Sequence, residues 1–269
     1  MKQTLSLLLT CALLLGLSPA FAVAPAQIEL VVFAAASMTE TLTEFIDQYK
    51  AVAPHVKIVA SFDSSGTLKT QIENGAPCDL FISAAQRQMN QLDISQDDKG
   101  NPGRLDFVLQ GSRLNLLQNK VVLVVPEGNP DKIEGFADLA RASLIAIGNA
   151  DVPVGSYSLE ILDYLALDEV ALAQEGRLTY GSNVKEVTTQ VKEGAVSCGI
   201  VYATDAYSAG LTVVDEATKD MCSQVIYPAA VIQTGSQPEA AQDFLDYLKT
   251  EEAAMVFEAV GFSMVQPAP

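Results

Sequence analysis

The pattern of apolar positions predicts alternating strands and helices in the first part of the chain. Residues 28–34 form an uninterrupted apolar run of strand length, and the segment after it repeats apolar side chains at helical spacing. Further strands are predicted at 56–62 and 80–83, with a short helix at 67–73 between them. Strands that are apolar throughout and separated by helices indicate a mainly parallel sheet covered on both faces.

A polar stretch at 95–104 interrupts this alternation and is predicted to be a surface loop. A second set of elements follows it. The predicted strands are 121–125, 144–147, 178–180, 199–202 and 211–214, and the predicted helices are 136–140, 156–165 and 184–192. After an apolar segment at 227–232, two more helices are predicted at 238–248 and 251–260.

Two α/β units of similar size, without a linker rich in Pro, Gly or Ser, predict two lobes joined by short strands. We expect lobe I to comprise 23–117 plus 227–269 and lobe II to comprise 118–226. Ligands of open α/β sheets bind beyond the carboxyl ends of the strands, where helix N-termini present free N–H groups. The cleft between the lobes is therefore the expected binding site.

The first 22 residues have the pattern of a secretory signal peptide. Lys2 precedes an apolar run of 13 residues, which is shorter than the ~20 residues that span a bilayer. Small residues at Ala20 and Ala22 predict cleavage after Ala22 and export to the periplasm. A lipoprotein signal at Cys11 fits less well, because Thr10 precedes it and the apolar run continues past it.

Composition narrows the class of protein further. The 269 residues are 49% hydrophobic and carry 16 Lys plus Arg against 33 Asp plus Glu, for a net charge of −17. Such a chain is repelled by nucleic acid and by anionic membranes. The single histidine, His55, lies in a predicted loop, and neither GxSxG nor a Gly-Lys phosphate loop occurs. We therefore expect neither an enzyme nor a cofactor.

The predicted mature chain keeps three cysteines, so at least one thiol stays unpaired in a monomer. Cys78 and Cys198 adjoin predicted strand cores and are expected to be buried. If the exported protein contains a disulfide, Cys198 with Cys222 is the favoured pair.

Small and hydroxyl residues gather where predicted strands lead into helices. They comprise Ala34–Ser37, Asp63–Thr67, Val152–Ser156 and Gly181–Val184, with Tyr202 at the end of another strand. Each serine taken alone fits an N-cap. Together, these turns direct helix N-termini and hydroxyl groups toward one cleft, which suits a small anion without Lys or Arg. None of the segments contains Arg, and the nearest Lys is Lys185.

In these segments the chain resembles the periplasmic molybdate-binding proteins of ABC importers, a branch of the type II periplasmic binding protein fold. The matching residues are 32–37, 61–68, 72–84, 152–155, 199–202 and 261–262. The resemblance implies a monomeric two-lobed protein that captures molybdate or tungstate and delivers it to a membrane permease. Molybdenum would bind only as the oxyanion.

The family's ligand-binding groups carry over to five positions. They are the hydroxyl groups of Ser37, Ser65 and Tyr202 and the backbone N–H groups of Val154 and Val184, the last matched mainly by position.

The chain departs from the common family pattern at Cys78 and at Asp63. A carboxylate within reach of the ligand would accept a proton from an anion such as hydrogen phosphate. We expect the Asp63 carboxylate to point to solvent, which favours molybdate and tungstate over phosphate.

Two other ligand classes stay open at this stage. Another oxyanion such as sulfate would use the same donors. A receptor for organic solutes would need an Arg at the cleft to bind a carboxylate, and the candidate segments contain none.

Overall fold

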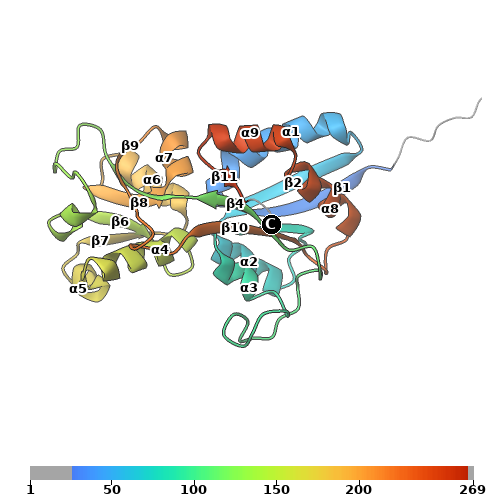
Figure 1. The fold of residues 1–269 in the computed structure, drawn as a ribbon, viewed down its shortest axis with the longest axis horizontal. Helices are drawn as coiled ribbons and strands as arrows, with labels where there is room; N and C mark the ends of the chain where they lie inside the picture. The colour runs from blue at the N-terminus through green and yellow to red at the C-terminus, as the bar shows by residue number, and fades with distance from the viewer. Residues whose placement is uncertain (1–25, 266–269) are drawn as a thin grey trace, which may run out of the picture.

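Two mixed β-sheets, each packed against helices, form the framework of the molecule (Figure 1). The computed structural model describes residues 26–265, so the predicted signal peptide and its cleavage site lie outside the described residues. One sheet has six strands in the order β11-β4-β10-β3-β1-β2, and the other has five in the order β7-β6-β8-β5-β9. The prediction of two sheets flanked by helices is confirmed.

The six-stranded sheet lies on the right in Figure 1, with α1 and α9 on one side and α2 and α3 on the other. Its strands are β1 (Ile28–Ala35), β2 (Val56–Asp63), β3 (Leu80–Ile82), β4 (Leu114–Asn119), β10 (Val225–Val231) and β11 (Ser263–Met264). Its helices are η1 (Ala36–Met38), α1 (Thr39–Val52), α2 (Ser65–Glu73), α3 (Gln86–Asn90), α8 (Pro238–Tyr247) and α9 (Glu251–Ala259). Apolar side chains at helical spacing hold these layers together, as where Phe45 packs on Phe257 with ring centroids 4.6 Å apart.

The five-stranded sheet lies on the left in Figure 1. Its strands are β5 (Val121–Val125), β6 (Ile145–Gly148), β7 (Leu178–Gly181), β8 (Cys198–Tyr202) and β9 (Thr212–Glu216). Its helices are η2 (Phe136–Ala140), α4 (Pro153–Tyr164), α5 (Glu169–Gln174), α6 (Val184–Lys192) and α7 (Ala203–Ala209). Within residues 26–265, no helix has the length and apolar character needed to cross a membrane.

Both sheets contain more antiparallel strand pairs than the apolar pattern predicted. β1 pairs in parallel with β2 and β3, and β6 pairs in parallel with β7 and β8. The pairs that involve β4, β5 and β10 are antiparallel. These strands adjoin the two passages between the sheets, at Lys120 and between Glu216 and Val225. β5 and β10 each enter their sheet from the other lobe, and each runs antiparallel to its neighbours. The apolar pattern of a strand does not show in which direction the strand runs, so the sequence did not predict these antiparallel pairs. The lobe boundaries predicted from the sequence stay a prediction.

Two helices begin earlier than predicted, and both differences bear on the cleft. α2 begins at Ser65 rather than at residue 67, and α4 begins at Pro153 rather than at residue 156. Proline suits the first turn of a helix because that position needs no backbone N–H. Ser65 and Val154 therefore lie in first helical turns. The polar stretch at 95–104 contains neither helix nor strand, as predicted.

The cysteine pairing favoured by the sequence is wrong. Cys78, Cys198 and Cys222 are free thiols, the first two buried and the third half-buried. Cys198 lies fully buried on β8, where burial raises the pKa of its thiol to about 12. Cys222 lies in the passage between β9 and β10. The expectation that Cys78 and Cys198 are buried is confirmed.

Candidate functional site

A small cavity lies where strand ends of the two sheets meet. It encloses no more than about 190 Å³ of free space. Its lining consists of Ala35, Ala36, Ser37, Asp63, Ser64, Ser65, Ala84, Val152, Pro153, Val184 and Tyr202. The structure thus brings together four of the five predicted residues, Ser37, Ser65, Val184 and Tyr202. Val154 is buried one position beyond Pro153 and does not itself line the cavity.

Helix N-termini from both sheets surround this cavity. α2 follows β2 directly, and Ser64 caps it by accepting the Thr67 N–H at 3.1 Å. α6 begins at Val184, and Asn183 caps it by accepting the Glu186 N–H at 3.1 Å. The caps are therefore Ser64 and Asn183, whereas Ser37 and Ser65 cap no helix. First-turn N–H groups have no acceptor in the preceding turn of the helix, and those that neither a cap nor another protein group accepts are available to a ligand.

A hydrogen-bond network orients the Ser37 hydroxyl. The side-chain oxygen of Asn119, Oδ1, accepts the Lys120 N–H at 2.8 Å. The side-chain nitrogen, Nδ2, is therefore directed to the Tyr227 hydroxyl, 3.2 Å away. The Tyr227 oxygen accepts that bond. By distance alone either hydroxyl could donate in the 2.8 Å contact between Tyr227 and the Ser37 Oγ, but the Tyr227 proton has no other acceptor among the described residues, so we assign Tyr227 as the donor. Ser37 consequently accepts from Tyr227 and keeps its own proton for the cavity.

Sequence analysis missed Asn119 and Tyr227 as functional residues. Asn119 falls in β4, which was not predicted, and Tyr227 was noted only as the start of an apolar segment. A polar residue at the end of one strand and a phenol within another carry no signal of their contact across 108 residues.

The Ser65 hydroxyl is oriented in the same way. Ser65 is fully buried, and its Oγ accepts the Ala84 backbone N–H at 2.9 Å. The hydroxyl proton is left to point elsewhere, and the cavity is the space that Ser65 lines. Both serines therefore face the cavity as hydrogen-bond donors.

The Tyr202 hydroxyl is the most unusual group of the site. Its side chain is 1% exposed, and its hydroxyl makes no hydrogen bond with any described residue. Burial raises the pKa of Tyr202 well above the ordinary value, so the hydroxyl keeps its proton. A buried hydroxyl without a partner is costly, and native structures rarely keep one without a purpose. The Tyr202 hydroxyl therefore has an unused proton at the lining of the cavity.

Positive side chains are absent from the described lining, and one negative side chain is present. Asp63 is half-buried and belongs to the lining, and its carboxylate accepts the N–H of Ser64 at 2.7 Å, which holds it over the turn before α2. The expectation that this carboxylate points to solvent stays a prediction. Within residues 26–265, no three His, Cys, Asp or Glu side chains gather to hold a bare metal ion.

Two hydrogen bonds join the lobes next to lining residues of the cavity. The Gly66 N–H donates to the Asp151 carbonyl oxygen at 3.2 Å, and Arg87 donates to the Ala150 carbonyl oxygen at 2.8 Å. A Cβ atom at Gly66 would lie 2.3 Å from the Asp151 oxygen. Only glycine permits this approach of α2 to the segment before α4.

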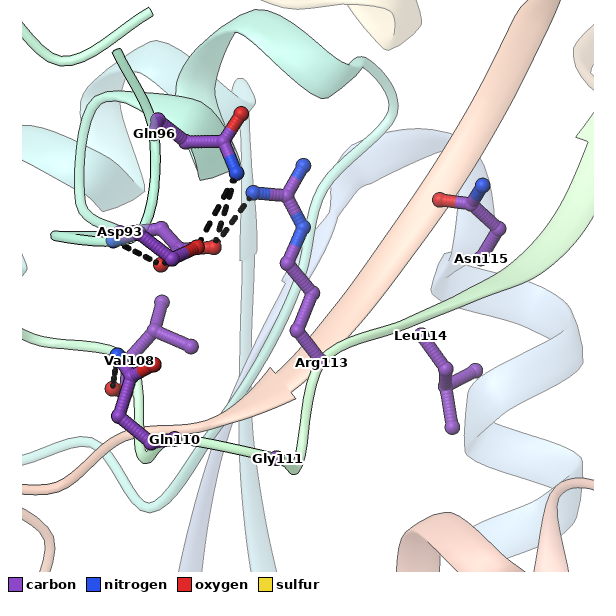
Figure 2. A pocket seen from close by; sticks show the side chains of 9 residues that line it. Asp93, Gln96, Val108, Gln110, Gly111, Arg113, Leu114 and Asn115 are labelled. Atoms are coloured by element: carbon purple, nitrogen blue, oxygen red, sulfur yellow. Dashed lines mark hydrogen bonds and ion pairs between the residues drawn. The ribbon is translucent and has the colours of Figure 1, made fainter.

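A larger hollow of about 670 Å³ lies elsewhere on the six-stranded lobe, beside β4. Figure 2 shows its Arg113 guanidinium directed toward Asp93 and Gln96. The Arg113 donors are already engaged, with Asp93 at 2.8 Å and with Gln86 at 2.6 Å. None of the five predicted site residues lines this hollow.

Two lobes with a donor-lined cavity between them define a bilobal solute-binding protein. The family model for bacterial extracellular solute-binding proteins matches residues 30–263, and the chain belongs to this family. The expected type II periplasmic binding protein fold is thereby confirmed. Its relatives are binding proteins of transport systems and not enzymes, and they indicate no cofactor.

Individual relatives match over nearly their whole length. A Bacillus subtilis protein provisionally named as an ABC transporter substrate-binding lipoprotein, YvgL, is 35% identical over 88% of this chain and 87% of its own. The molybdate-binding protein ModA of Haemophilus influenzae is 33% identical over 94% of this chain and 96% of its own.

Solved structures agree with these relatives. The periplasmic molybdate-binding protein of Azotobacter vinelandii is 26% identical, with a TM-score of 0.72, over 89% of this chain and all of its own. The sulfate-binding protein SubI of Mycobacterium tuberculosis has a TM-score of 0.70 at 19% identity, over 90% of this chain and 88% of its own, and shows the fold alone.

Proposed function

We propose that this protein captures molybdate or tungstate in the cavity between its lobes and delivers the oxyanion to the membrane permease of an ABC importer. The ligand donors are the hydroxyl groups of Ser37, Ser65 and Tyr202 together with the N–H groups at the starts of α4 and α6, namely those of Val154 and Val184. The names of the relatives support molybdate as the ligand.

The unpartnered hydroxyl of Tyr202 is the observation that carries this proposal. Ser37 and Ser65 already accept hydrogen bonds from the protein, so all three hydroxyl groups offer protons to the same cavity. A set of hydrogen-bond donors selects a ligand that presents hydrogen-bond acceptors on every side, and a fully deprotonated tetrahedral oxyanion meets that condition. A receptor for an organic carboxylate would need an Arg at the cleft, and no Arg belongs to the described lining of this cavity.

Sulfate is the alternative ligand, because it presents the same tetrahedral acceptors. A thermal-shift titration of the mature protein with molybdate, tungstate, sulfate and phosphate at fixed ionic strength separates the candidates. A dye or calorimetric readout is required, since the chain contains no Trp. Ligand at ~1,000 times its dissociation constant adds about 4 kcal/mol of stability. We expect that shift with molybdate and tungstate only, and a shift with sulfate alone would reassign the site.

We further propose that the protein acts as a monomer in the periplasm, after cleavage behind Ala22. The signal-peptide pattern of the first 22 residues supports export. Intact mass and N-terminal sequencing of the exported protein test the cleavage, with Val23 as the expected first residue. Light scattering at increasing concentration tests the monomer.

A further inference from the structure

The ammonium group of Lys185 lies between carboxylates of the two lobes. Its Nζ donates to Glu40 Oε1 at 2.9 Å and to Glu40 Oε2 at 2.7 Å, and it lies 3.1 Å from Asp205 Oδ1. Glu40 belongs to α1 beside the six-stranded sheet, whereas Lys185 and Asp205 belong to α6 and α7 beside the five-stranded sheet. The contact with Glu40 therefore joins the lobes, and the contact with Asp205 stays within one lobe.

Asp205 holds the ammonium group from within its own lobe, with Oδ1 3.1 Å from the Lys185 Nζ. The Asp205 side chain is fully buried, and neither of its carboxylate oxygens accepts a hydrogen bond within the described part of the chain. Lys185 is thus its nearby counter-charge. Burial alone would lower the pKa of Lys185, but the Asp205 and Glu40 carboxylates outweigh burial and raise it. The ammonium group stays charged and directed toward the position that Glu40 occupies in the closed protein.

Both partners adjoin residues of the cavity. Glu40 lies in the first turn of α1, three residues after Ser37, and Lys185 directly follows Val184. The Lys185 contact with Glu40 therefore lies close in sequence to a site residue of each lobe. It involves α1, whereas the Gly66 contact involves α2 on the other side of the six-stranded sheet (Figure 1).

We propose that Lys185 is a positioning residue, held in place by Asp205, which binds Glu40 across the cleft and keeps the lobes closed over the bound oxyanion. The proposal rests on the proposed function and adds a determinant of ligand residence time that does not touch the ligand. Because the contact with Glu40 crosses the cleft, its loss is expected to speed ligand release rather than to slow capture.

Glu40→Gln is the decisive variant, since it removes the charge across the cleft and leaves the Lys185 pair with Asp205 intact. Glu29→Gln is its matched control. The Glu29 carboxylate pairs with Lys57 at 2.9 Å and is about as exposed as Glu40, at 59% against 53%, but both of its partners lie on one sheet. Both variants change the net charge equally.

Stopped-flow or surface-based kinetics with molybdate provides the first readout. We expect Glu40→Gln to release molybdate about two to five times faster than wild type, as the loss of a partly exposed ion pair predicts, with no slowing of association. Glu29→Gln should release it at the wild-type rate, and Lys185→Arg should retain slow release. Equal release rates for Glu40→Gln and Glu29→Gln would overturn the proposal while leaving the proposed function intact.

Small-angle scattering without ligand provides an independent readout. We expect Glu40→Gln to have a larger radius of gyration than Glu29→Gln, because its lobes open more often. If wild-type protein fails to bind molybdate, the proposed function is wrong, and the scattering comparison then tests the role of Lys185 on its own. A larger radius of gyration for Glu40→Gln than for Glu29→Gln supports the contact across the cleft, and equal radii reject it.

Discussion

The Tyr227 hydroxyl lies 2.8 Å from the Ser37 Oγ and determines where Ser37 directs its proton. Asn119 donates to the Tyr227 oxygen, so the Tyr227 proton goes to Ser37 and the Ser37 proton is left for the cavity. Asn119 lies in β4 and also donates to Thr204 of α7 at 2.9 Å. The passage between the sheets is thereby linked to the orientation of a ligand-binding hydroxyl.

Tyr227→Phe tests this relationship. The variant keeps the aromatic packing but leaves Ser37 free to donate elsewhere, so we expect about tenfold weaker molybdate binding, or about 1.4 kcal/mol. Isothermal titration calorimetry provides the measurement. Tyr207→Phe is the control, because Tyr207 is 66% exposed and outside the cavity lining. Unchanged affinity in Tyr227→Phe would show that Ser37 needs no such orientation.

Tyr202→Phe should change stability and affinity in opposite directions. Without ligand, replacing a buried hydroxyl that has no protein partner removes a desolvation cost of roughly 1–3 kcal/mol, so the melting temperature should rise or stay constant. With ligand, loss of a charge-assisted hydrogen bond should weaken binding about 10- to 100-fold. Melting curves with and without molybdate measure both effects. A variant that loses stability without ligand would mean that the hydroxyl has a structural partner.

Asp63→Asn tests the only charged side chain in the described cavity lining. Asparagine retains an oxygen that accepts the Ser64 N–H but removes a negative charge beside the bound dianion. We expect affinity for molybdate to rise severalfold, up to about tenfold, and the order of anions to stay unchanged. Competition of phosphate against molybdate measures that order, and a gain or loss of phosphate binding would assign Asp63 a role in selection.

The sequence predicted that strand ends and helix starts build the cavity, because continuous apolar runs and turn residues are local signals, although α2 and α4 begin two and three residues earlier than predicted. Ser37, Ser65, Val184 and Tyr202 follow such signals, and all four line the cavity. Local signals carry no information on contacts between distant segments. The Tyr227 contact with Ser37 and the Lys185 contact with Glu40 span 190 and 145 residues, so only the folded chain reveals them. The free thiols of Cys198 and Cys222 illustrate the same limit.

Asp205 predicts a specific dependence of stability on pH. Burial raises the pKa of Asp205 from 3.8 to about 6, although Lys185 lowers it in part. Between these values the unfolded chain is ionised at Asp205 while the folded protein keeps the proton, so folding takes up a proton. The contribution of Asp205 to stability is therefore fully present below about pH 4 and is lost as the pH rises through 6. The charge of Lys185 does not change in this window, because its own pKa is raised from 10.5.

Asp205→Asn removes this dependence, so the comparison of the two proteins isolates it from the other carboxylates. We expect the stability of wild type relative to Asp205→Asn to fall between pH 4.5 and pH 7, by about 2 kcal/mol for a shift of this size. Denaturant unfolding without ligand at the two pH values measures the difference. The same comparison with Asp47→Asn, whose carboxylate is exposed at 67%, should show no such fall. A constant difference between wild type and Asp205→Asn would mean that Asp205 is ionised throughout this range, held so by Lys185 at 3.1 Å.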